Sequence, residues 1–312
     1  MQALNFLKET HPDFHKGLFQ ALLATAMAAL FIIPWKLASE SGSPATMVLL
    51  LCVTAAVLNN LTQVIQNGVR SLITKPSSLE LMLGGLFALL TLLGNYSSAQ
   101  AVSYLSPALV ATIMRAEVII IALLALLLIG EKITARFWFG ISFVLLGFYI
   151  MAPSGTGQED WFTGSSYALV ATSAFATMAV VTRKYIGKID VSNLNSIRLW
   201  LSVLFWFPLN PGGLDLDVVN GELLIYTGIA AFLGPCMGRL IFMNSARYIE
   251  AKIAGVAVST APLFAVVFGI IFLGEYPSNV EVLGGAVLLM GIVATIFQES
   301  SHAGKPSHSL QE

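Results

Sequence analysis

The sequence predicts an all-α polytopic membrane protein, with ten transmembrane helices arranged as two inverted five-helix repeats. Three observations point to this fold class. The composition is too apolar for a water-soluble domain, ten apolar runs are long enough to cross a bilayer, and the second half of the chain echoes the first.

The composition is typical of a protein embedded in lipid. Of 312 residues, 56% are hydrophobic and 11% are charged, and the mean hydropathy is +0.81. A soluble domain carries about 25% charged residues. The net charge of −1 gives no reason to expect a nucleic-acid partner.

Cysteine and histidine give no sign of a metal centre or a catalytic histidine. Cys52 and Cys236 both lie inside apolar runs, without the spacing of a ligand cluster or a disulfide framework. All the histidines lie in the tails, at His11, His15, His302 and His308. We therefore expect neither a metal nor a cofactor, and we expect that the chain is not an enzyme.

Reading the apolar runs between helix breakers gives ten spans, because a spanning helix needs about 20 mostly apolar residues. They are 18–38, 45–67, 79–101, 106–129, 135–152, 162–182, 192–209, 222–246, 251–273 and 279–297. The predicted units are a tail over 1–16, a first repeat over 17–152, a linker over 153–161, a second repeat over 162–297 and a tail over 298–312. A signal peptide cleaved near Ala38 is the alternative for the first run, but a later segment that echoes this run favours a span.

The basic residues predict the orientation, because Lys and Arg collect in cytoplasmic loops. With a cytoplasmic N-terminus, the inner loops and tails hold twelve basic residues and the outer loops hold Lys36 alone. The twelve are Lys8, Lys16, Arg70, Lys75, Lys132, Arg136, Arg183, Lys184, Lys188, Arg247, Lys252 and Lys305. We therefore expect both termini in the cytoplasm and a multi-pass location in the inner (cytoplasmic) membrane.

A shift of 144 residues places 79–150 on 223–294 without a gap, and ten positions match. Among them are a Gly-Glu pair at the end of an apolar run and four further glycine pairs. A shift of 147 places the segment 21–25 on 168–172. Because each copy has an odd number of spans, the copies must be inverted relative to each other. Inverted repeats place a binding site near the midplane and allow alternating access, which predicts a transporter.

Two five-helix repeats that each close the fourth helix with an apolar-Gly-Glu sequence resemble the drug/metabolite transporter (DMT) superfamily, specifically its EamA-type members. The resemblance rests on Ile129-Gly130-Glu131, on Leu273-Gly274-Glu275, and on the stretch from Gly238-Arg239 through Pro262 to Glu275. It implies a ten-helix exporter or exchanger of small metabolites. The first copy departs from the family pattern, because Val118 stands where Pro262 stands in the second copy.

Arg115 and Glu117 are the first candidates for a substrate or coupling site. If the fourth helix starts near Ser106, they lie about 13 and 17 Å along it, near the middle of the bilayer, where charged residues face a cavity or a partner. On a continuous helix they point about 200° apart. Either they form a substrate or proton site, or they belong to a structural network between helices.

Four further residues join the candidate list. Asn95 and Arg239 occupy matching repeat positions, and Arg239 lies at the depth of Ser259. The alternative for Arg239 is that its side chain snorkels to the interface. Trp200, with Trp35 and Trp206, is expected in an interfacial aromatic belt, although Trp200 could instead stack on a substrate.

The remaining motif residues are expected to be structural. Glu131 and Glu275 follow helix ends, and their carboxylates are predicted to accept amides at the start of the next helix. Gly130, Gly274 and Pro262 complete this motif set. Helices 5 and 10 carry almost no polar residue, and each presents two glycines seven residues apart, which predicts close packing of a scaffold pair.

The function predicted from these features is a secondary transporter, an exporter or exchanger of small metabolites. An arginine and a glutamate at depth would suit amino acids or related zwitterionic and anionic compounds. Protons are a candidate coupling ion, and a homodimer is a candidate assembly. The alternative is a membrane protein that does not transport, either an embedded enzyme or an adaptor.

Overall fold

The computed structural model describes residues 14–68, 76–117, 119–121, 123–124, 135–151, 158–185, 188–245, 248, 257–258, 260–274 and 276–300. Within these ranges, the side chains of 14, 66–67, 135–138, 148, 183, 191, 243–244, 262 and 292–300 are not described. This part of the chain is helical and contains no strand.

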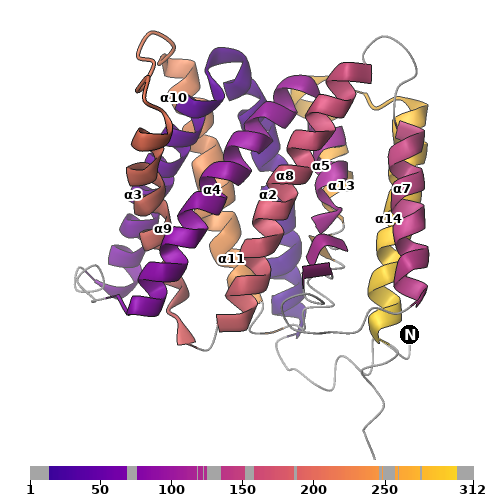
Figure 1. The fold of residues 1–312 in the computed structure, drawn as a ribbon, viewed down its shortest axis with the longest axis horizontal. Helices are drawn as coiled ribbons and strands as arrows, with labels where there is room; N and C mark the ends of the chain where they lie inside the picture. The colour runs from indigo at the N-terminus through magenta and orange to yellow at the C-terminus, as the bar shows by residue number, and fades with distance from the viewer. Residues whose placement is uncertain are drawn as a thin grey trace, which may run out of the picture.

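Ten helical segments follow one another along the described residues (Figure 1). The first five are α2 (Phe14–Ser41), α3 (Pro44–Asn67), α4 (Ser78–Tyr104), α5 (Pro107–Met114) and α7 (Ala135–Met151). The next three are α8 (Gln158–Tyr185), α9 (Val191–Leu209) and a composite of α10 (Gly221–Ala231), the π-helix η3 (Phe232–Gly238) and α11 (Arg239–Ser245). The last two are α13 (Ala261–Phe268), continued by the π-helix η4 (Gly269–Leu273), and α14 (Asn279–Ser300).

Five of these segments are long and apolar enough to cross a membrane uninterrupted, and others are shorter apolar helices. Together with the two-repeat organisation, they confirm the predicted all-α, ten-helix membrane fold.

Helix starts follow from local capping chemistry. Ser43 and Ser106 each precede a proline at the first helical position, and their hydroxyls accept an amide of the first turn of α3 and α5. Ser77 and Glu80 form a reciprocal capping box at the start of α4. Short Ser-Pro and Asx signals therefore end the links and begin the next span.

The helices form two four-segment bundles that mix the sequence repeats. In one bundle α4 packs against α8 and α9, and α5 packs against α8. In the other, α2 packs against the α10–η3–α11 segment and α13, and α3 packs against α10 and η3. Exchanging the two halves of the sequence converts one bundle into the other. The bundles contact each other where α3 meets α9 and where α5 meets α13, which we call the two seams, and also where α4 meets α2 and α3.

The two remaining helices, α7 and α14, stand side by side at one edge of the molecule (Figure 1). Their backbones approach at glycines: a Cβ built on Gly147 would lie 2.7 Å from the carbonyl oxygen of Gly284. One built on Gly291 would lie 2.6 Å from the carbonyl oxygen of Gly140. Small residues permit such close contact between helices, so the predicted glycine packing of this pair is confirmed.

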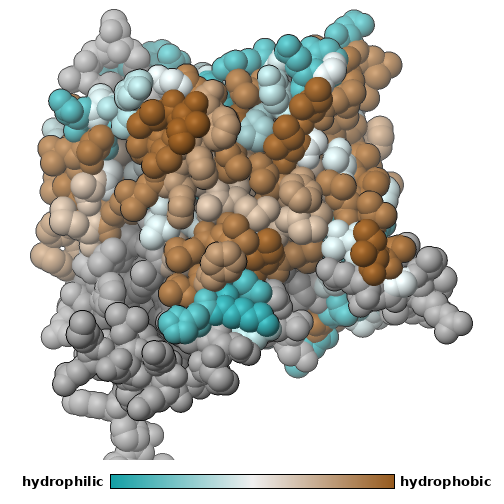
Figure 2. Space-filling view, turned by 180° about the vertical axis from the view of Figure 1, so that it is seen from behind, coloured by the Kyte–Doolittle hydropathy of each residue, from teal (hydrophilic) through white to brown (hydrophobic). Residues whose placement is uncertain are grey.

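The outer surface is apolar. Figure 2 shows a broad hydrophobic band across one face, with hydrophilic residues gathered along its upper edge. Two of the three tryptophans expected in an interfacial belt are instead core residues: Trp35 is 0% exposed and Trp206 is 1% exposed. Trp35 stacks on Phe31, and the Trp206 Nε1–H donates to the carbonyl of Ala45 at 2.8 Å. The belt prediction was wrong for these two because their rings fill space between helices.

Candidate functional site

Two helices that meet at a bundle seam are broken at matching repeat positions. α5 ends at Met114, and the amide of Arg115 donates to the carbonyl of Thr112 at 3.0 Å, in a tighter i to i−3 pattern. In the second copy, the amide of Thr260 donates to the carbonyl of Ala257 at 3.1 Å. The fourth span was predicted as continuous over 106–129, so the break is a correction. Discontinuous helices near the midplane free backbone groups that can face a ligand.

The proline of the second copy explains one break. Pro262 stands in the first turn of α13, and a proline has no N–H to donate to the carbonyl four residues earlier. The first copy has no proline at the matching position, because Val118 stands there.

Arg115 bridges the two broken helices. Its Nε–H donates to the carbonyl of Ala111 at 3.2 Å, and its Nη1–H donates across the seam to the carbonyl of Val258 at 3.2 Å. The side chain is 9% exposed. The guanidinium therefore donates a hydrogen bond to a carbonyl on the opposite side of the seam and joins the segment of α5 to that of α13.

Glu117 lies on the far side of the break and is partly buried. It interacts electrostatically with Arg115 and with Arg239. The expectation that Arg115 and Glu117 point about 200° apart assumed a continuous helix. Because the helix is broken at Arg115, that expectation no longer applies. Glu117 thus connects the charge of one bundle to that of the other.

Arg239 takes its position from a π-helical stretch. η3 contains Pro235 and ends at Gly238, immediately before Arg239 begins α11. Wider turns of this kind redirect the side chains that follow and are frequent at functional sites. Arg239 is partly buried and interacts with Glu117 and with a third arginine, Arg198.

Arg198 lies on α9 and is 3% exposed. Its Nη1 donates to Thr91 Oγ1 on α4 at 3.2 Å, and its Nη2 donates to Asn195 Oδ1 at 2.8 Å. The Nε atom is buried without a hydrogen-bond partner. Counted from the start of α9, Arg198 lies about 10 Å along the helix, and Arg239 lies about 9 Å from the end of α11.

The Arg198 site rests on a polar seam between α3 and α9. Asn59 Nδ2 donates to Ser196 Oγ at 2.7 Å, and its Oδ1 accepts from Asn195 Nδ2 at 2.9 Å. Gln63 Nε2 donates to the carbonyl of Ser192 at 2.8 Å. Asn59 and Gln63 are buried, so this polar end of α3 is a contact between helices.

The other predicted candidates are spread over the fold. Asn95 is buried on α4, and its Nδ2 donates to the carbonyl of Thr91 at 2.8 Å, within its own helix. Trp200 is 44% exposed on α9, whereas neighbouring Arg198 is buried. Gly274 adopts a positive φ of 65° and ends η4 as a left-handed cap. Ser259, Gly130, Glu131, Glu275 and the side chain of Pro262 lie outside the described residues.

At the start of α14, the amide of Ser278 donates to Glu281 Oε2 at 2.7 Å, and the amide of Glu281 donates to Ser278 Oγ at 3.2 Å. Ser278 therefore caps this helix together with Glu281.

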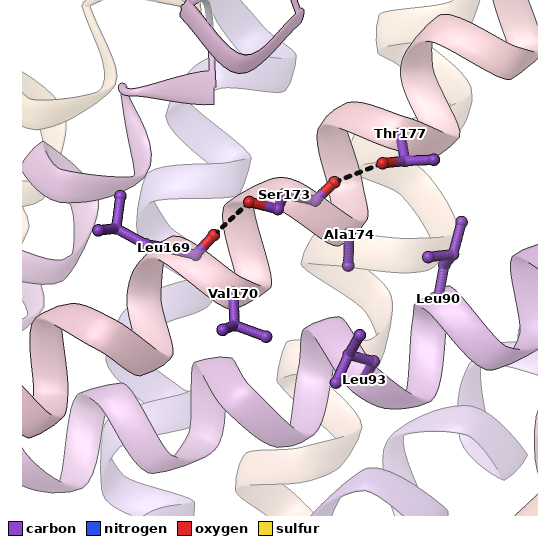
Figure 3. Close-up of a pocket in the computed structure, with 7 residues that line it drawn as sticks. All are labelled: Leu90, Leu93, Leu169, Val170, Ser173, Ala174 and Thr177. Carbon is purple, nitrogen blue, oxygen red and sulfur yellow. Dashed lines mark hydrogen bonds between the residues drawn. The ribbon is translucent and has the colours of Figure 1, made fainter. Parts of the chain in front are cut away.

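A groove of about 340 Å³ lies between α4 and α8 (Figure 3), and none of the residues that line it is charged. Leu93, Leu169 and Val170, which line it, are exposed at the protein surface. The hydroxyls of Ser173 and Thr177 both donate to carbonyls of their own helix. The groove thus offers an apolar, membrane-facing surface without free polar chemistry.

Sequence reasoning did not single out Arg198, Asn195, Asn59 or Thr91 as members of a site. A usable signal was present: Asn195, Ser196 and Arg198 interrupt an apolar span within four residues, and Asn59, Asn60 and Gln63 do the same in the partner span. Two polar clusters at corresponding ends of two spans predict an interhelical contact.

Comparison with known proteins agrees with this architecture. The EamA-like transporter family matches residues 15–152 and, a second time, residues 162–297. An uncharacterized transporter of Synechocystis sp. is 26% identical over 165 residues, which cover 49% of this chain and 46% of the relative. A chloroplastic WAT1-related protein of Arabidopsis thaliana is 27% identical over 217 residues, 65% of this chain and 51% of the relative. The chain spans about half the length of these two relatives.

A solved structure, described only as the crystal structure of a protein, shares the fold with a TM-score of 0.62 at 12% identity. The similarity covers 90% of this chain and 96% of that one. The family match extends over most of the chain and both repeats, and it coincides with the ten helical segments. The chain belongs to the EamA-like transporter family.

Proposed function

We propose that this chain is a secondary exporter or exchanger of small metabolites that carry an anionic group, such as amino acids and related compounds. The substrate would bind among Arg115, Glu117 and Arg239, and alternating access would expose this site to the two sides in turn. One observation carries the proposal: charged side chains from both bundles converge where α5 and α13 break.

The chemistry of the cluster supports a charged substrate. Charges inside a membrane are costly and are retained at substrate or ion pathways. A guanidinium binds a carboxylate through two parallel hydrogen bonds, and Glu117 can take the ammonium group of a zwitterion or a proton.

The mixing of the two repeats in each bundle determines which units would move during alternating access. Because each bundle takes two helices from each repeat, the units expected to rock are the mixed bundles. Motion of one bundle against the other would open and close the seams α3–α9 and α5–α13. The moving units of this proposal are therefore bundles that each contain helices of both repeats.

We further propose the inner membrane as the location, with both termini in the cytoplasm, from the distribution of lysine and arginine. Proton coupling through Glu117 and a homodimeric assembly belong to the same proposal.

Flux measurements on purified protein in proteoliposomes test the proposal. Radiolabelled L-alanine, L-lactate, succinate and sn-glycerol 3-phosphate would be tested with and without unlabelled solute inside. We expect at least one to be taken up by wild type and accelerated by internal solute. Arg115→Gln should reduce that flux at least tenfold while the protein remains folded by size-exclusion chromatography.

Lys36→Gln is the matched control, because Lys36 is a partly buried cation whose ammonium donates to the carbonyl of Val102, at 2.7 Å, outside the cluster. Full activity is expected for this variant. Equal flux in Arg115→Gln and wild type would contradict the site assignment. An absence of flux for all solutes would favour the alternative of a non-transporting membrane protein.

A further inference from the structure

We propose that Arg198, together with Arg239, forms an anion-binding subsite and that the substrate is a small dianion, such as a dicarboxylate or a phosphate monoester. This inference rests on the proposed transport function and narrows its substrate class. The observation behind this proposal is that Arg198 is buried, that its Nε–H has no hydrogen-bond partner, and that its charged neighbour is Arg239.

The hydrogen bonds of Arg198 hold it without neutralising it. Thr91 Oγ1 accepts a hydrogen bond from Nη1, and Asn195 Oδ1 accepts one from Nη2. Both acceptors are neutral. Nε is buried with no partner. A buried polar group without a partner is rare and calls for an explanation, such as a missing ligand.

The charges around Arg198 do not compensate it either. Its electrostatic neighbours among the described residues are Arg239, a like charge, and the thiol of Cys52. Two guanidinium groups held near each other in a low-dielectric interior repel strongly unless an anion joins them. Ser202, one turn further along α9, bonds to the backbone at Ala88 and Arg198 and adds no charge.

The site is built in advance of any ligand. Asn195, which orients Arg198, is itself held by Asn59 across the seam at 2.9 Å. Thr91 and Asn195 are both buried. A fixed guanidinium loses less freedom on binding than a mobile one, which is the advantage of preorganisation.

Charge balance indicates the substrate class. Within the membrane interior the sequence places three arginines, at 115, 198 and 239, and one glutamate, at 117. These four residues together carry a formal charge of +2 when all of them are ionised. A ligand with two negative charges neutralises it, whereas a zwitterion or a monoanion leaves it positive.

Thermal unfolding of the purified full-length protein, followed by tryptophan fluorescence, tests this proposal. The probes are succinate, sn-glycerol 3-phosphate, L-lactate and L-alanine at constant ionic strength set with chloride. We expect a dianion to raise the melting temperature at concentrations at least tenfold lower than lactate or alanine requires. Comparing succinate with glycerol 3-phosphate separates a dicarboxylate substrate from a phosphate ester.

Arg198→Gln should lose that stabilisation, with the apparent Kd for the dianion raised at least tenfold. Its melting temperature without ligand should stay at or above the wild-type value, because an uncompensated charge has been removed. Arg198→Lys, which keeps the charge but not the fork, should bind with intermediate affinity. Lys36→Gln should keep the full dianion effect.

Two results would overturn the proposal. The first is an Arg198→Gln variant that melts earlier without ligand yet keeps the dianion-induced shift, since Arg198 would then serve only to join α9 to α4. The second is wild-type protein that gains nothing from either dianion. Alanine or lactate flux in proteoliposomes, unchanged in Arg198→Gln, would refute the dianion subsite and leave the proposed transport function intact.

Discussion

Replacing Gly147 with alanine should separate α7 from α14. The added Cβ would lie 2.7 Å from the carbonyl oxygen of Gly284 and 2.7 Å from both the Cβ and the amide nitrogen of Leu288. Two of these atoms belong to the backbone, so no rotamer change can make room. Ordinary van der Waals contact begins at 3.4 Å, which requires the helices to move apart by about 0.7 Å at this point.

The size of the effect follows from two opposing terms. Overpacking of a close contact costs about 1–3 kcal/mol, while glycine to alanine inside a helix gains about 1 kcal/mol of helix propensity. Gly85→Ala is the matched control, because Gly85 lies inside α4 and a Cβ there would meet nothing within 4 Å. Both variants gain the helix term, so the difference between them isolates the steric term of about 1–3 kcal/mol.

Reversible unfolding in mixed micelles, titrated with sodium dodecyl sulfate, measures the free energy of unfolding for both variants. We expect Gly85→Ala to be at least as stable as wild type and Gly147→Ala to be less stable than Gly85→Ala. Equal stabilities would refute the conclusion that backbone contact at the glycines holds α7 against α14.

Three further outcomes are expected. Asn59→Ala should destabilise the α3–α9 seam by about 1–3 kcal/mol, because it removes two buried side-chain bonds worth about 0.6–1.7 kcal/mol each in a membrane; Ser173→Ala, whose hydroxyl bonds only to its own helix, should change stability by less than about 0.5 kcal/mol in the same titration. An alkaline phosphatase fused after Glu312 should be inactive in cells, and an active fusion would contradict the proposed orientation. Glu117→Gln should remove any dependence of flux on pH if protons couple through this carboxylate, whose charged neighbours are Arg115 and Arg239; a pH profile identical to wild type would exclude that role.

The sequence was sufficient for the number of helical segments and for the close packing of α7 and α14. The length of an apolar run decides whether a segment can span the membrane, and that length is a local property of the sequence. Several helix starts were likewise predicted to within a few residues, because capping residues such as Ser77 and Ser106 act on their own first turn. The glycines at 147 and 284 were informative because only a residue without a side chain allows this contact.

The break in α5 and the position of Arg198 could not be predicted in the same way. No proline or glycine marks the chain at Arg115, and the bond from its side chain to Val258 depends on a segment 143 residues away. Trp206 was misplaced for a related reason: its carbonyl partner, Ala45, lies on α3. Tertiary contacts decided all three, and single-helix periodicity carries no information about them.

The two copies share a frame and differ in charge, and this difference is the basis of the proposed site assignment. The breaks at Arg115 and Thr260 and the glycines of α7 and α14 recur in both copies, as the geometry of two inverted halves requires. The charges do not recur: Arg239 matches Asn95 in the first copy, while Arg115 matches a serine in the second. A symmetric frame does not need an asymmetric charge. The charged residues that lack a counterpart are therefore the ones that we propose serve transport, and we expect their substitution to change transport before it changes folding.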